Sequence, residues 1–126
     1  MKVKHEIDIY AGVTGFDEQK DCSVRAFSIA ACISYEESHK AFERHGRISK
    51  KPTTLLTSRR VWKELFPDYE WIEGILGMTL NQFALKHNKG HYVVHTRGHA
   101  LAVCDGVIHD WSPSIKRKVH QAVKLV

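Results

Sequence analysis

The sequence has few cysteines, and their positions exclude the roles that clustered cysteines usually have. Only three occur among 126 residues, Cys22, Cys32 and Cys104, and no two of them form a C-x-x-C pair. An odd and scattered set argues against a disulfide framework and against a cysteine-based zinc site. Cys32 and Cys104 lie among apolar residues, so we expect both to be small core residues, and a reducing compartment suits three free thiols.

The sequence also lacks segments that direct a chain into or across a membrane. No run approaches the ~18 uninterrupted apolar residues of a membrane-spanning helix. The charged start, Met-Lys-Val-Lys-His-Glu, is not followed by the apolar stretch of a secretory signal. We therefore expect a cytoplasmic protein with no membrane partner.

Charge of one sign is not concentrated anywhere in the chain. Lysine and arginine total 19 against 14 acidic residues, which gives a formal net charge of +5. This excess favours acidic partners such as nucleic acid, but the densest basic run is only Lys116, Arg117 and Lys118. Nucleic-acid binding is therefore an alternative to be kept and not the first hypothesis.

The length and the 43% hydrophobic content suit one domain that spans residues 1–126. Alternation of apolar and polar residues predicts a strand over 3–10. Helices are expected over 22–33, from the capping pattern Ser34–Glu37 to about residue 44, over 58–66, and from the capping pattern Thr79–Gln82 to about residue 88. Strands are expected over 91–96, 99–104, 107–111 and 118–126. Helices followed by an antiparallel sheet make an α+β fold.

Cys22 lies at a position where a thiol becomes reactive. Asp21 is a suitable N-cap, and the run from Cys22 to Ile33 is small or apolar except for Arg25, which is typical of a buried helix. The unpaired N–H groups at a helix start favour negative charge and lower a thiol's pKa. Asp21 opposes this effect by its own charge unless its carboxylate is occupied in capping.

His99 and Asp110 are brought together by a predicted hairpin. The Asp105-Gly106 turn sets Ala102 opposite His109 and Leu101 opposite Asp110. Residues 99 and 101 then share a face of the sheet with residues 108 and 110, so His99 and Asp110 are diagonal neighbours. A carboxylate that accepts from one imidazole nitrogen leaves the other available as a base.

These segments resemble papain-like cysteine peptidases. The run from Asp21 to Ala31 looks like their nucleophile helix, Gly98-His99-Ala-Leu-Ala-Val103 looks like their histidine strand, and Asp110-Trp111-Ser112 looks like the segment that orients the histidine. The chain is most similar to short phage-encoded proteins of this fold, and in layout to bacteriocin-processing peptidases. The two blocks cover about a quarter of the chain, which is about half the length of a full papain domain.

The resemblance implies a papain-like fold, in which an N-terminal nucleophile helix and further helices pack on a C-terminal antiparallel sheet. It also implies a cysteine hydrolase with Cys22 as nucleophile, His99 as base and Asp110 as orienting group. Gln19 would correspond to the family's oxyanion donor, although it lies closer to the cysteine than usual. The expected substrate is a peptide or protein, cleaved or transferred at an amide, isopeptide or thioester, and the reaction needs no cofactor.

Two alternatives stay open on the sequence alone. The chain has nine histidines, of which His95 and His99 flank a turn and could approach each other, but we interpret them as solvated strand residues and expect no metal. The second alternative is a non-catalytic phage-type factor that keeps the fold and binds a host protein or nucleic acid. Lys116, Arg117 and Lys118 would then matter in place of Cys22.

Overall fold

A computed structural model describes residues 4–7, 21–48, 51, 53–110 and 117–126, and these residues form an α+β fold. The described helices are α1 (Cys22–Ala31), α2 (Tyr35–Arg44), α3 (Leu55–Leu65) and α4 (Leu80–Lys86). The described strands are β1 (Lys4–Ile7), β2 (Glu70–Trp71), β3 (His91–Thr96), β4 (His99–Cys104), β5 (Val107–Asp110) and β6 (Gln121–Lys124).

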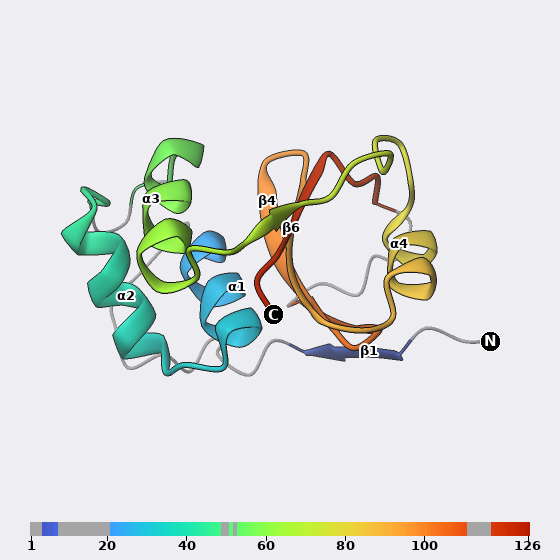
Figure 1. Cartoon of the computed structure of the whole chain (residues 1–126), viewed down its shortest axis with the longest axis horizontal. Coiled ribbons are helices and arrows are strands. Elements are labelled where there is room, and N and C mark those ends of the chain that lie inside the picture. The colour runs from blue at the N-terminus through green and yellow to red at the C-terminus, as the bar shows by residue number, and fades with distance from the viewer. Residues whose placement is uncertain (1–3, 8–20, 49–50, 52, 111–116) are drawn as a thin grey trace.

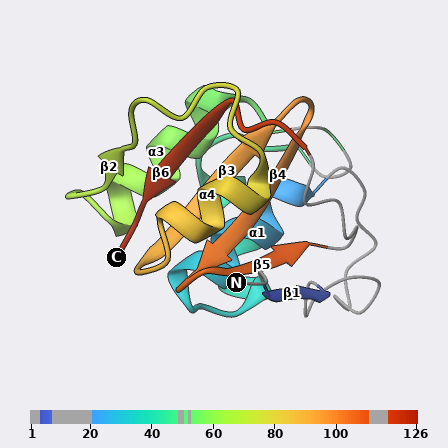
Figure 2. The same cartoon turned by 90° about the vertical axis from the view of Figure 1, so that its right-hand side faces the viewer.

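The strands form one sheet in the order β1-β5-β4-β3-β6-β2. The five strands from β5 to β2 pair antiparallel. The sequence predicts four of them, and the short strand β2 was not expected. The strand β1 adds a parallel edge beside β5, with Ile7 opposite Asp110 (Figure 2). This parallel pairing was not expected. It is feasible because the helical segment between the two strands supplies the long connection that a parallel pair requires.

Helices cover both faces of the sheet (Figure 1). On one face, α1, α2 and α3 enclose a core whose fully buried side chains include Val24, Phe27, Phe42 and Trp62. On the other face α4 packs through Leu80 and Phe83. The sheet therefore separates two apolar cores, and each strand between them needs apolar residues on both sides.

The central position of α1 follows from its composition. Its small and apolar residues bury nearly every side of the helix, as the sequence predicts. Phe27 makes edge-to-face contacts with Phe42 of α2 and with Phe66 after α3, at centroid distances of 5.8 and 5.9 Å. These contacts fix α1 between the sheet and the outer helices, and so fix the position of its first residue, Cys22.

Of the two cysteines expected in the core, one is not there. Cys32 is exposed and not part of the core, because it follows α1 as a left-handed C-cap (φ 58°) where the chain turns outward. Cys104 is half-buried against the core, as expected. Trp71 belongs to the short strand β2, and it packs edge-on against Trp62 at 5.6 Å.

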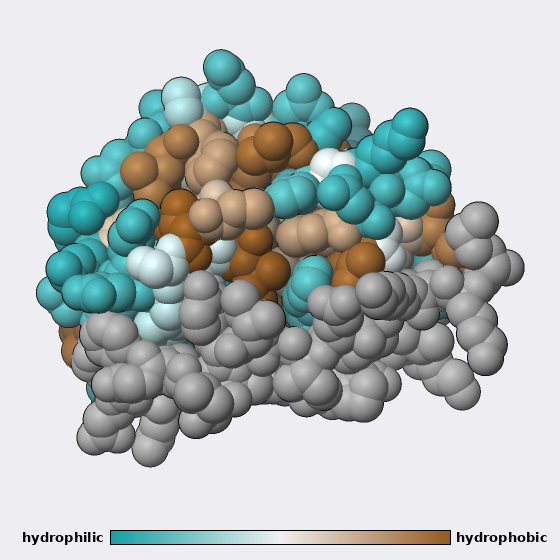
Figure 3. Space-filling view, turned by 90° about the horizontal axis from the view of Figure 1, so that it is seen from below, coloured by the Kyte–Doolittle hydropathy of each residue, from teal (hydrophilic) through white to brown (hydrophobic). Residues whose placement is uncertain are grey.

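The outer surface is of mixed polarity. Seen from below the view of Figure 1, hydrophobic side chains gather across the middle of the coloured area and hydrophilic ones border them (Figure 3). Among the described residues, no helix combines the length and the apolar character needed to cross a bilayer.

Candidate functional site

Cys22 is the first residue of α1, and it is half-buried. The local sequence determines this position. Asp21 is the N-cap of α1, and Val24 and Phe27 are buried in the core, so the first turn of the helix is held against it. The N–H groups of the first helical turn have no partner within the helix, so this end favours a thiolate.

His99 and Asp110 lie in direct contact. The Nε2 atom of His99 is 2.8 Å from Oδ1 of Asp110, and both side chains are largely shielded from water, with exposures of 9% and 2%. The hairpin register that the sequence predicts is confirmed, since Ala102 pairs with His109 and Cys104 with Val107. With Nε2 committed to the carboxylate, Nδ1 is the ring nitrogen left for a second partner.

That second partner is the Cys22 thiol. Burial raises the pKa of Cys22, but hydrogen bonds with the His99 side chain and the Ala100 backbone, together with the charge of His99, lower it below its ordinary value. Burial lowers the pKa of His99, whereas hydrogen bonds with Asp110 and Cys22 raise it to about 9. Both net shifts favour a thiolate beside an imidazolium, which is the reactive form of such a pair.

A buried ion pair supports the start of α1. The carboxylate of Asp21 lies 3.3 Å from Nε of Arg25 and accepts a 2.7 Å hydrogen bond from the hydroxyl of Tyr35. It makes no capping bond with the helix, so the expected side-chain cap is absent. Arg25 nevertheless balances the negative charge of Asp21, to which Tyr35 adds a hydrogen bond, and the charge of Arg25 lowers the pKa of Cys22.

Arg25 and Tyr35 are residues that the sequence reasoning missed. Arg25 is only 3% exposed. A signal was available, because Arg25 is the one charged residue in an otherwise apolar run and stands four residues after Asp21, the spacing of a helical ion pair. Tyr35 had no local signal, since only the packing of α2 on α1 brings it to Asp21.

Some predicted residues lie outside the described part of the chain. Gln19, the expected oxyanion donor, is one of them, and so are Trp111, Ser112 and Lys116. The described site therefore consists of Cys22, its helix N-terminus, His99 and Asp110.

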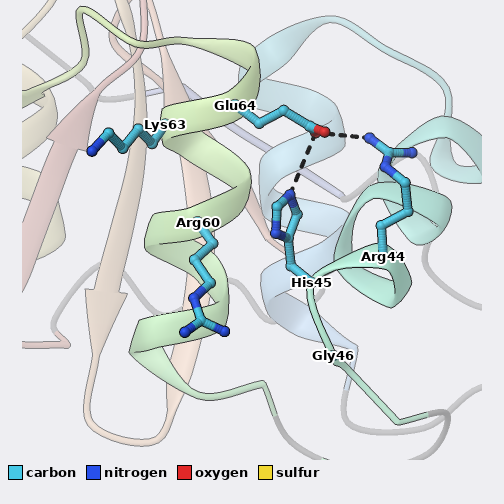
Figure 4. Close-up of a pocket in the computed structure, with 6 residues that line it drawn as sticks. All are labelled: Arg44, His45, Gly46, Arg60, Lys63 and Glu64. Atoms are coloured by element: carbon cyan, nitrogen blue, oxygen red, sulfur yellow. Dashed lines mark hydrogen bonds and ion pairs between the residues drawn. The ribbon is translucent and has the colours of Figure 1, made fainter.

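A groove lies between α2 and α3 and shares no residue with this site. It measures about 680 Å³, and its lining consists of Arg44, His45, Gly46, Arg60, Lys63 and Glu64 (Figure 4). Glu64 lies 2.7 Å from Arg44 and 3.6 Å from His45. Arg60 and Lys63 point away from this group in Figure 4, so the groove presents their positive charge outward.

The histidines do not gather into a metal site within the described residues. No three His, Cys, Asp or Glu side chains there could hold one ion. His95 and His99 flank the turn, but His95 stands opposite Ala100 and His99 opposite Thr96, so alternation along each strand points the two side chains to opposite faces.

Comparison with known proteins gives no further assignment: no family model, no curated protein and no solved structure matches this chain.

Proposed function

We propose that the chain is a cysteine-dependent hydrolase of papain-like type, acting through Cys22, His99 and Asp110. The observation that carries the proposal is the continuous chain of hydrogen bonds from the Cys22 thiol through the His99 ring to the buried Asp110 carboxylate. A nucleophile, a base and a group that orients the base are the three parts that acyl transfer requires.

The proposed reaction begins when the Cys22 thiolate attacks the carbonyl carbon of an amide, isopeptide or thioester. The carbonyl oxygen becomes negative and is stabilised by the backbone N–H groups at the start of α1. His99 gives its proton to the leaving group as the carbon–leaving-group bond breaks. Water or another acceptor then attacks the thioester, His99 takes the proton from it, and Cys22 is released.

Asp110 has a positioning role in this scheme. Its contact with Nε2 holds the tautomer and the ring orientation in which Nδ1 faces Cys22, and its charge stabilises the imidazolium. Asp21 is kept from opposing the thiolate because Arg25 and Tyr35 engage its carboxylate. Every charged group described around Cys22 is therefore consistent with a reactive thiolate.

The proposal can be tested without knowing the natural substrate. A small activated ester, p-nitrophenyl acetate, should acetylate Cys22 with a burst of one equivalent of nitrophenol per chain, and intact mass should locate the acetyl group on Cys22. Cys22→Ser should abolish the burst, and His99→Ala should slow it at least about 100-fold, the lower range for loss of a general base. Cys104→Ser is the matched control and should keep the burst. Equal turnover by Cys22→Ser and wild type would refute the proposal.

A second candidate function rests on the groove between α2 and α3. Arg60 and Lys63 form no ion pair with any other described residue, and a protein with a net charge of +5 attracts acidic surfaces. A non-catalytic factor could bind an acidic host protein or nucleic acid there. If so, Arg60→Glu with Lys63→Glu would abolish its biological effect, whereas Cys22→Ser would leave that effect intact.

A further inference from the structure

A groove of about 510 Å³ lies between α3 and the segment that follows it into β2. The wall formed by α3 carries Leu56, Arg59, Arg60 and Lys63, and the facing wall carries Tyr69 and Trp71. None of these residues belongs to the candidate site around Cys22. The groove is therefore a separate feature of the surface, and its own chemistry indicates what it binds.

The α3 wall of this groove is one stripe of the helix. Residues 56, 59, 60 and 63 have the spacing i, i+3, i+4 and i+7, so their side chains lie on the same face. Arg59, Arg60 and Lys63 are all exposed, and the lining of the groove includes no Asp or Glu. Three positive charges therefore face the groove with no carboxylate in its lining to neutralise them.

The facing wall carries an aromatic ring that is fixed in place and open to solvent. Trp71 packs edge-on against Trp62 and Tyr69, at centroid distances of 5.6 and 6.3 Å, yet 39% of its surface is exposed. The guanidinium carbon of Arg59 lies over the ring at 5.9 Å from its centroid, near the limit of about 6 Å for a cation–π contact. A planar group already lies over this face of Trp71, so the face is accessible from the groove.

The combination of cations with an exposed aromatic face discriminates between classes of acidic partner. The net charge of +5 attracts any polyanion. An acidic peptide would pair with the cations but would leave Trp71 without a planar partner. Single-stranded nucleic acid supplies both parts, because its phosphates pair with cations and its unpaired bases stack on aromatic rings. The volume lies within the roughly 300–1,000 Å³ of small-ligand pockets, so a base with its sugar fits.

We propose that the groove between α3 and β2 binds single-stranded nucleic acid without sequence preference. One base stacks on Trp71, and the phosphates on either side of it pair with Arg59, Arg60 and Lys63. The guanidinium of Arg59 leaves the ring for a phosphate, and the base takes its place. This activity goes beyond the proposed function and is independent of it, since no residue of the groove takes part in the chemistry at Cys22.

The test is a fluorescence anisotropy titration of the full chain with fluorescein-labelled oligothymidylate and oligouridylate. Both have about 12 nucleotides, within the roughly 4–16 that one single-strand-binding fold covers. An abasic strand of equal length keeps the phosphates without the bases, and it should bind at least about fivefold more weakly, the loss of one base–aromatic stack. The tighter of the two nucleotide strands identifies DNA or RNA as the source.

Three outcomes of this titration would overturn the proposal. Binding of neither nucleotide strand would exclude a nucleic-acid site. Equal binding of the abasic strand would show that charge alone is recognised. Equal binding of a polyglutamate of the same length would make the groove a site for an acidic protein.

Trp71→Leu locates the stacked base, because Trp71 lines this groove and not the one between α2 and α3. The variant keeps an apolar side chain but loses the aromatic face, so oligothymidylate should bind at least about fivefold more weakly. Its affinity for the abasic strand should equal that of wild type, which also shows that the fold is intact. An unchanged affinity for oligothymidylate would refute the role of Trp71.

A pair of double variants tests the cations. Arg59→Gln with Lys63→Gln should reduce the slope of log affinity against log salt by about 1.4, because each cation paired with a single-strand phosphate contributes about 0.7. Lys86→Gln with Lys89→Gln is the matched control, since it removes the same charge at the exposed end of α4, on the other side of the sheet (Figure 1). The control should keep the slope of wild type. Equal slopes in the two double variants would show that only net charge matters and would refute the groove.

Discussion

At the scale of single residues, the site depends on a few buried charges that neutralise one another. Asp110 and Asp21 are 2% and 6% exposed, and each has a cationic partner, His99 and Arg25. A charge left without its partner in such an environment is strongly destabilising, whereas the intact pair can be nearly neutral for stability. A variant that removes one member of either pair should therefore lower the unfolding free energy by more than the loss of a single contact, because the remaining charge stays buried without a partner.

We predict that Asp110→Asn destabilises the fold in a pH-dependent way. The pKa of His99 is raised to about 9, so its stabilising contribution is complete below the unfolded value near 6.5 and is lost as pH rises through 9. At pH 6 the variant should lose about 2 kcal/mol of unfolding free energy, the scale of a hydrogen bond to a charged group. Urea denaturation at pH 6 and pH 10 should show the difference shrinking, and an equal loss at both would contradict the assignment.

Arg25→Met should lower stability and thiol reactivity together. The variant keeps a long side chain but leaves the Asp21 carboxylate buried without its cation, which should lower the unfolding free energy by about 3–5 kcal/mol. Because the charge of Arg25 lowers the pKa of Cys22, alkylation of Cys22 should also slow.

Tyr35→Phe is the comparison variant for Arg25→Met, because it changes the surroundings of Asp21 without removing the cation. This variant removes one hydrogen bond to Asp21 and keeps Arg25, so it should cost about 2 kcal/mol. Denaturation curves of both variants measure the two losses of unfolding free energy. A loss in Arg25→Met no larger than that in Tyr35→Phe would show that the ion pair is unimportant for stability.

At the scale of elements, the β4–β5 hairpin is what brings His99 to Asp110. Both turn residues have positive φ, 49° at Asp105 and 81° at Gly106, as a two-residue turn of the primed type requires. A Cβ at Gly106 would also lie 3.4 Å from Cβ of Asn88. The positive φ of both turn residues therefore sets the register between β4 and β5, and this register places His99 beside Asp110.

Gly106→Val should weaken both the hairpin and the site. A β-branched residue at this φ should lower the unfolding free energy by about 1–3 kcal/mol, and Cys22 alkylation should slow because the His99–Asp110 contact is disturbed. Asp105→Gly, which suits the same turn, is the matched control and should keep the alkylation rate of wild type. Circular dichroism melts and alkylation rates of the two variants provide the comparison, and indistinguishable variants would speak against the role of the turn.

The β4–β5 hairpin is the part of the candidate site that could be predicted from the sequence. The Asp105-Gly106 signal and strand alternation were enough to predict the pairing of Ala102 with His109, and hence the approach of His99 to Asp110. The capping bonds at Ser34 and Thr79 were predicted for the same reason, because each depends on residues three positions apart. Local patterns determine local geometry.

What was missed depends on contacts between distant segments. The parallel pairing of β1 with β5 joins residues about 100 positions apart, and no local pattern encodes it. Tyr35 reaches Asp21 only because α2 packs on α1.

At the scale of the whole molecule, one sheet holds two cores together. Leu80 of α4 is fully buried on the face opposite α1, and Leu76 is 80% exposed. Because both cores share the same strands, loss of packing on the α4 face should weaken the whole domain, including the face that carries Cys22.

Leu80→Ala and Leu76→Ala form a matched pair for this prediction. The first should lower the unfolding free energy by about 2–5 kcal/mol, and the second should change it by less than about 0.5 kcal/mol. Tryptophan fluorescence, which includes Trp62 in the α1 core, should report the same urea midpoint as circular dichroism. Separate midpoints for the two signals would show that the cores unfold independently.

The proposed reaction requires a thiolate at Cys22 that His99 stabilises and Asp110 supports. The most direct test is the rate of iodoacetamide alkylation at Cys22 from pH 4 to 9, followed by peptide mass mapping, with Cys32 and Cys104 as internal controls. We predict that Cys22 reacts well below the ordinary thiol pKa of about 8.5, that His99→Ala removes this reactivity, and that Cys104, whose pKa is raised to about 12, stays inert. If Cys22 is as slow as Cys104, or equally fast in His99→Ala, the reactive pair does not exist.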